Sequence, residues 1–145
     1  MTHYFADKDE VIVAALLQAD AAMQHRLDAA SDLGKAPVDR LLDTLPHDDA
    51  SRRDWLVSRA FADAAIRSET LRRHHRQSKT QWLATAAEAI AEQAGCTIDE
   101  ARLDAELIVA VVDAIGEAAC VDPDDWPVER QRQLLEHCLA RTTLR

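Results

Sequence analysis

Cysteine, glycine and proline are all scarce in this chain of 145 residues. The three cysteines, Cys96, Cys120 and Cys138, are odd in number and lack the spacing of metal ligands, so we expect reduced thiols. With only 3 glycines and 4 prolines, few positions interrupt regular structure, and β-branched residues cluster in few places. These shortages favour an all-α fold.

Positive charge and long apolar runs are also in short supply. The 17 basic residues face 26 acidic ones, and the net charge of −9 should repel DNA unless a local basic surface exists. No apolar run reaches the length of a membrane span and no signal peptide opens the chain, so we expect a cytoplasmic protein with no membrane partner. A hydrophobic content of 48% excludes a disordered chain and suits one folded domain.

Motifs of catalysis are absent from the sequence. It contains no HExxH, no Glu-x-x-His pair, no glycine-rich phosphate loop and no nucleophile elbow. Glu136 and His137 are sequence neighbours, so one helix face cannot present both to a single metal ion. We therefore expect neither an enzyme nor a bound metal or cofactor.

Helical periodicity is what the chain has in abundance. Apolar residues recur at the spacing of three and four that marks one helix face, and capping signals separate the segments. Asp7 with Glu10, Ser68, and Thr97 with Glu100 have the form of helix starts, one of Asp48, Asp49 or Ser51 can cap another, and Gly95 has the form of a helix end. About six helices are predicted: from Asp7 to about Ala30, Val38 to Leu45, the segment around Trp55, Glu69 to Gln93, Thr97 to Ala119, and Val128 to Thr142.

The segment from Leu107 to Ala119 is apolar almost all round, interrupted only by Asp113, Gly116 and Glu117. A helix of this kind is buried on several sides. In a chain this short, one of those sides is expected to belong to a partner subunit.

The stretch HYFADKDEVIVAAL is similar to the end of the DNA-binding domain of TetR-family transcriptional regulators, with Tyr4-Phe5 and Lys8 at matching positions. The remainder resembles the ligand-binding and dimerisation domain of the BetI-like branch. Asp113 fits that pattern, whereas Ala114 replaces its glycine. The segments that carry the resemblance, in the order of that branch, are Trp55, Glu69–Gln93, Gly95, Leu107–Ala119 and Val128–Thr142.

The resemblance implies that residues 1–8 are the remnant of a DNA-binding domain and that 9–145 form the ligand-binding and dimerisation domain. His3, Tyr4 and Lys8 would contact DNA phosphates in a complete regulator. The helices that precede this point in the family form the helix-turn-helix, and without them we expect no operator recognition. For this chain we favour the alternative that the three residues bind nothing.

The resemblance also places an inducer pocket among these helices. Aromatic walls with one or two polar groups are typical of ligand sites. Ordinary core packing explains any single tryptophan equally well. With Arg59 nearby, an apolar or weakly anionic ligand is expected. The candidate pocket residues are Met23, Leu27, Trp55, Arg59, Phe61 and Trp82.

Two further surfaces stand out. The basic run Arg72, Arg76 and Lys79 is interpreted as a solvated helix face rather than an anion site. The resemblance also implies that the last two helices form half of a four-helix-bundle dimer interface, with small residues at Ala110, Ala114, Gly116 and Ala118 allowing close approach. The predicted interface residues are Val111, Ala114, Ile115, Ala118, Val128, Leu135, Cys138 and Leu139.

Two functions are compatible with the sequence. The first is a TetR-like regulator, a repressor by preference over an activator, whose DNA binding is relieved by an unknown small-molecule effector. The second is a stand-alone dimerisation module that sequesters full-length regulators. An in-frame helix-turn-helix upstream of Met1 would support the first, and a stop codon there the second. Both predict a homodimer.

Overall fold

The structure, a computed structural model, describes the backbone of residues 2–142 and the side chains of residues 8–142. Within that part of the chain every regular element is an α-helix, which confirms the all-α prediction with its six helices. None of these helices is long and apolar enough to cross a membrane. The helices are α1 (Thr2–Asp32), α2 (Pro37–Leu42), α3 (Asp49–Ala65), α4 (Glu69–Ala94), α5 (Arg102–Val121) and α6 (Val128–Thr142).

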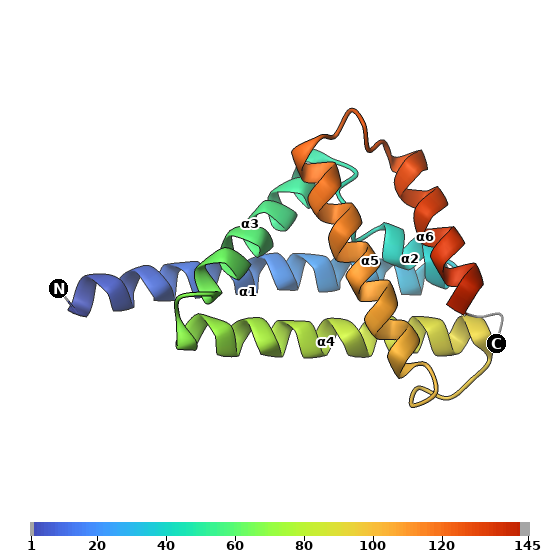
Figure 1. Cartoon of the computed structure of the whole chain (residues 1–145), viewed down its shortest axis with the longest axis horizontal. Coiled ribbons are helices and arrows are strands. Elements are labelled where there is room, and N and C mark those ends of the chain that lie inside the picture. Colours follow the sequence, from blue (N-terminus) through green and yellow to red (C-terminus); the bar gives the residue numbers. More distant parts are fainter. Residues whose placement is uncertain (1, 143–145) are drawn as a thin grey trace.

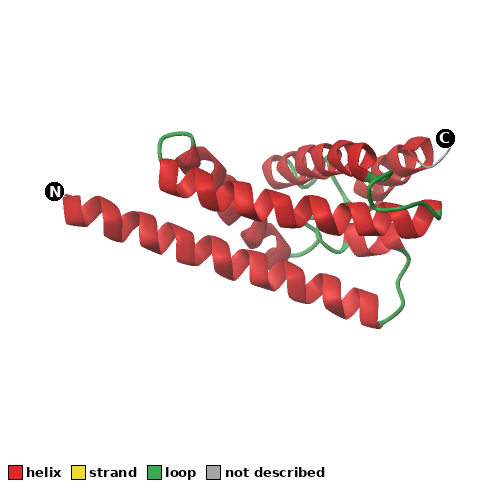
Figure 2. Ribbon diagram, turned by 90° about the horizontal axis from the view of Figure 1, so that it is seen from below, coloured by secondary structure: helices red, strands yellow, loops and turns green. Residues whose placement is uncertain are grey.

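The two longest helices, α1 and α4, lie side by side and run in the same direction (Figures 1 and 2). Helix α3 packs against both, and α5 crosses α4 diagonally in Figure 1. Helix α6 packs against α5 and α2. The N-terminal end of α1 projects past the α3–α4 turn in both views.

Several helix ends lie where the capping signals predict them. The Asp48 carboxylate accepts a hydrogen bond from the Ser51 backbone N–H at 2.7 Å, and the Ser51 hydroxyl oxygen accepts one from the Asp48 N–H at 3.1 Å. The Ser68 hydroxyl caps α4 at the N–H of Leu71. Gly95 ends α4 with a φ of 66°, a left-handed conformation that costs glycine nothing.

Two predicted helix starts are wrong. Helix α1 begins at Thr2, not at Asp7, because the preceding residues include no helix breaker and the helix continues through them. The Thr97 and Glu100 bonds do form, at 2.8 and 3.3 Å, but they close a turn, and α5 itself begins at Arg102. A capping pair thus satisfies local amides without fixing the first residue of the helix.

The main core lies where α2, α4, α5 and α6 meet. Leu45, Ile108 and Leu135 are fully buried in it. A smaller cluster joins α1, α3 and α4 through Leu16, Phe61, Ala65 and Leu71. Because α5 reaches the main core from one side only, its other sides are available for a cavity and for solvent.

Candidate ligand-binding cavity

A cavity of about 260 Å³ lies among α1, α3, α4 and α5. Such a volume suits a small organic molecule, although it lies slightly below the usual range for ligand sites. Five of the six residues predicted for a pocket line it: Met23, Leu27, Trp55, Arg59 and Trp82. They come from three different helices, so the fold brings together side chains that are far apart in the sequence.

Phe61 is the exception, and its prediction as a pocket residue is wrong. Its side chain is 1% exposed and packs in the smaller cluster with Leu16 and Leu71. Phe61 lies two residues beyond Arg59 on α3, and such a step turns a side chain to a different face of a helix. Phe61 therefore packs against Leu16, which itself lines the cavity.

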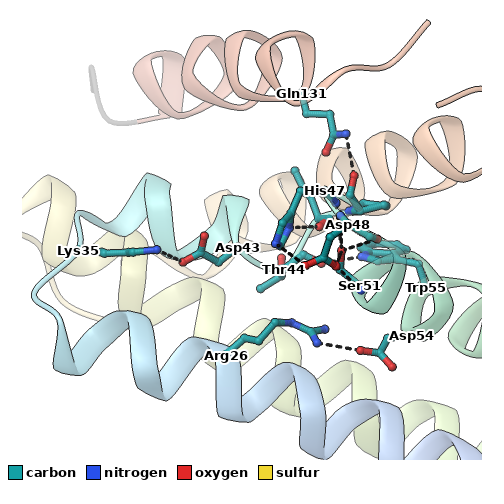
Figure 3. Close-up of polar contacts among 12 residues, drawn as sticks. Arg26, Lys35, Asp43, Thr44, His47, Asp48, Ser51, Asp54, Trp55 and Gln131 are labelled. Atoms are coloured by element: carbon teal, nitrogen blue, oxygen red, sulfur yellow. Dashed lines mark hydrogen bonds and ion pairs between the residues drawn. The ribbon is translucent and has the colours of Figure 1, made fainter. Parts of the chain in front are cut away.

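Trp55 is held in place on two sides. Its indole Nε1 donates a hydrogen bond of 2.6 Å to the Thr44 carbonyl oxygen in the α2–α3 connection (Figure 3). Its ring lies on Gly116 of α5, where an added Cβ would be 2.3 Å from the nearest ring atom. Gly116 is therefore required for the close approach of the indole to the helix backbone.

Ion pairs tie α5 to the helices on either side of the cavity. Arg59 of α3 pairs with Glu117 at 2.7 Å, and Lys79 of α4 pairs with Asp113. Asp113 and Glu117 lie one helical turn apart, and all four side chains line the cavity. The Glu117 carboxylate raises the pKa of Arg59. Lys79, interpreted from the sequence as part of a solvated basic face, is thus engaged in the cavity lining.

Asp20 of α1 is a third acidic residue in the lining. Its pKa is raised, chiefly because burial disfavours the charged form, although hydrogen bonding to Ser78 and the nearby charge of His75 act in the opposite direction. Within the described part of the chain, no salt bridge involves Asp20. Asp20, His75 and Ser78 form a polar region of a largely apolar cavity.

Sequence reasoning missed Asp20, His75, Ser78, Asp113, Gly116 and Glu117 in the lining. A usable signal existed on α1, where Asp20 lies between Leu16, Met23 and Leu27 in a series of three-residue and four-residue steps. Cys120 also lines the cavity, and burial raises the pKa of its thiol, which disfavours the reactive thiolate. The described residues contain no group of three or more side chains suited to hold a metal ion.

The predicted dimer surface is partly wrong. Ile115, Leu135 and Leu139 expose 0%, 0% and 2% of their surface, because they pack in the core of the chain itself. Gly116 faces Trp55 and so cannot ease the approach of a partner helix. Ala114 is exposed, as is Val128 at the start of α6, whereas Val111, Ala118 and Cys138 are half-buried.

Exposed apolar residues nevertheless extend over α5 and α6. Leu103 and Val121 each expose 75% of their surface, and Leu107 and Leu134 expose 48% and 40%. Together with Ala110 and Ala114, these exposed side chains are here called the α5–α6 face. Exposed apolar surface of this kind is typical of an interaction surface.

Of the predicted DNA contacts, Lys8 is exposed on α1, and the side chains of His3 and Tyr4 lie outside those that the structure describes.

Residues 38–144 match the family described as "BetI-type transcriptional repressor, C-terminal". No curated protein and no solved structure matches the chain. The match covers most of the chain, including the helices that form three walls of the cavity. The chain therefore belongs to the family of BetI-type transcriptional repressor C-terminal domains.

Proposed function

We propose that this chain is the effector-binding and dimerisation part of a ligand-responsive transcriptional repressor. The observation that carries the proposal is the cavity between α1, α3, α4 and α5 in a domain of this repressor family. A small molecule in the cavity favours one arrangement of the helices, and that arrangement weakens DNA binding. Such a regulator works in the cytoplasm and meets the operator through a helix-turn-helix unit joined to α1, with Lys8 on a phosphate.

Helix α1 is the element through which the effector would act. Leu16, Met23 and Leu27 of this helix line the cavity, so an occupant touches α1 directly. Leu16 also packs in the smaller cluster with α3 and α4 residues. Nearer the N-terminal end of α1, the Ser68 hydroxyl at the start of α4 donates a hydrogen bond of 3.1 Å to the Asp9 carboxylate. A shift of α1 relative to α4 would therefore reach the end of α1 that the DNA-reading unit adjoins.

The homodimer of this proposal uses the α5–α6 face. Four helices, two from each protomer, would pack together and bury Leu103, Leu107, Val121 and Leu134, which are exposed to solvent in the single chain. The dimer then sets the distance between its two DNA-reading units, and effector binding changes that distance.

Binding of DNA with and without effector tests the proposal. The regulator with its helix-turn-helix is titrated by calorimetry into DNA fragments flanking its own coding region. We expect binding of one such fragment in the absence of effector and weaker binding in its presence. A protein that binds none of the fragments in either state contradicts the proposal.

A further inference from the structure

The charges around the cavity are unevenly compensated. Arg59 and Lys79 already pair with Glu117 and Asp113, so a ligand carboxylate that approaches either base meets the repulsion of a carboxylate of α5. Among the residues that the structure describes, the lining offers no other Arg or Lys. An anionic ligand is therefore disfavoured, contrary to what Arg59 alone indicated in the sequence.

Asp20 has the opposite character. It is half-buried in the lining and lacks a salt bridge among the described residues, and burial raises its pKa. A half-buried carboxylate without a salt bridge is costly to keep ionised. A positive group on a ligand would supply the missing counter-charge and gain from the low polarity of the surroundings.

The neighbours of Asp20 add a second requirement. The Ser78 hydroxyl oxygen can accept a hydrogen bond, as can a neutral His75 ring nitrogen, and both side chains line the cavity with Asp20. A nitrogen that carries hydrogens can donate to several of these acceptors, whereas a quaternary nitrogen can donate to none. Trp55 and Trp82 contribute aromatic surface to the walls. Aromatic rings suit an apolar ligand body and attract cations to their faces.

We infer that the cavity binds a protonated primary or secondary amine carried on an apolar body, with Asp20 as the counter-ion of its ammonium group. The inference rests on the proposed effector role of the cavity and names the chemical class of that effector. Asp20 selects the charge, the acceptors beside it select N–H donors, and the two tryptophans select the apolar body.

Calorimetric titration with three matched probes tests the inference on the chain itself. Phenethylamine carries the ammonium group, its trimethylammonium analogue carries the same charge without N–H donors, and phenethyl alcohol is neutral. We expect phenethylamine to bind at least about tenfold more tightly than either analogue, and Asp20→Asn to remove that preference, since about 1.4 kcal/mol is tenfold in affinity.

Asp32→Asn provides the matched control, because Asp32 is exposed at the end of the same helix and does not line the cavity. This variant should bind phenethylamine as the unaltered chain does. Circular dichroism checks that both variants fold. The inference is overturned if phenethylamine does not bind, if the trimethylammonium analogue or the alcohol binds as tightly, or if Asp20→Asn keeps the preference. None of these results touches the proposed function, which fails separately in the DNA titration.

Discussion

Single residues set the shape of the cavity, and Gly116 does so most directly. An alanine Cβ at this position would lie 2.3 to 2.6 Å from three ring atoms of Trp55, whose Nε1 is held by the Thr44 carbonyl. Alanine favours a helix over glycine by about 1 kcal/mol, whereas overpacking costs about 1–3 kcal/mol. Gly116→Ala should therefore lower the free energy of unfolding or leave it little changed, and it should shift the indole into the cavity.

Chemical denaturation and ligand titration together check this expectation. Replacing Trp55 by Phe shortens the ring system that meets the new Cβ. The Gly116→Ala, Trp55→Phe double variant should therefore lose less free energy of unfolding than the sum of the losses in the two single variants. A Gly116→Ala chain that is clearly more stable than the unaltered one, with unchanged tryptophan fluorescence, would show that the indole does not lie on α5.

Asp20 illustrates a conflict between stability and binding at one side chain. Burial raises its folded-state pKa above the ordinary value of 3.8, so the ionised carboxylate weakens the fold at neutral pH. Asp20→Asn should raise the free energy of unfolding at pH 7, by less than about 1 kcal/mol because solvent screens a half-buried group. The same change should remove the preference of the cavity for an amine.

The sign of this effect predicts its pH dependence. Asp20→Asn should increase the free energy of unfolding by the full amount above the raised pKa. The increase should disappear as the pH falls below 3.8, where Asp20 is protonated in both the folded and the unfolded chain. Other titratable side chains of the lining are the same in the unaltered chain and in the Asp20→Asn variant. They are His75 and Lys79 of α4, Arg59 of α3, and Asp113 and Glu117 of α5. Thermal unfolding of the two chains across this pH range measures the difference. A variant that is less stable at pH 7 would contradict the account.

At the scale of helices, the start of α3 positions the cavity residue Trp55. Asp48 and Ser51 satisfy each other's backbone N–H groups, and Trp55 lies one turn further on. Asp48→Ala should lower the free energy of unfolding by about 1 kcal/mol, as the loss of an N-cap does. Asp48→Asn, which keeps an acceptor at the cap, should lose much less.

This cap has its own dependence on pH. The hydrogen bonds from Ser51 lower the pKa of Asp48 below 3.8. The cap therefore stabilises the fold above pH 3.8, and its contribution is lost as the pH falls through the lowered pKa. Thermal unfolding should show the difference between the unaltered chain and Asp48→Ala shrinking in that range. A difference that stays constant down to pH 2 would assign the effect to helix propensity alone.

Helices were more predictable from the sequence than their exact ends or their mutual contacts. Ser68 and Gly95 mark the ends of α4 because capping is a local property. The start of α5 was misplaced because the Thr97 and Glu100 bonds can close a turn as well as open a helix.

The cavity was predictable only in part, for a related reason. Large aromatic residues such as Trp55 indicate a pocket or a core, and only tertiary packing decides between them, as the burial of Phe61 illustrates. Asp113 and Glu117 were visible as interruptions of an apolar helix, but their partners Arg59 and Lys79 lie on other helices. Pairing over such sequence separations leaves no local signal.

At the scale of the whole molecule, α5 connects the two proposed binding surfaces. Asp113, Gly116 and Glu117 line the cavity on one side of this helix, and Leu107 and Ala114 are exposed on another. An effector that moves α5 would therefore also move the α5–α6 face. Dimerisation and effector binding are expected to be thermodynamically linked, so that each changes the affinity of the other.

The location of the dimer interface is the most direct test at this scale. Ala114 is exposed near the middle of the α5–α6 face, between Leu107 and Val121 along the helix. Ala114→Glu would place a charge in the desolvated centre of the interface, where it costs several kcal/mol. Sedimentation at micromolar concentration should show a folded monomer for this variant and a dimer for the unaltered chain. Ala140→Glu adds the same charge at an exposed position of α6 and should leave the dimer intact. If Ala114→Glu remains dimeric while keeping its helix content, then the two protomers meet elsewhere, and Leu103, Leu107 and Val121 need a different partner.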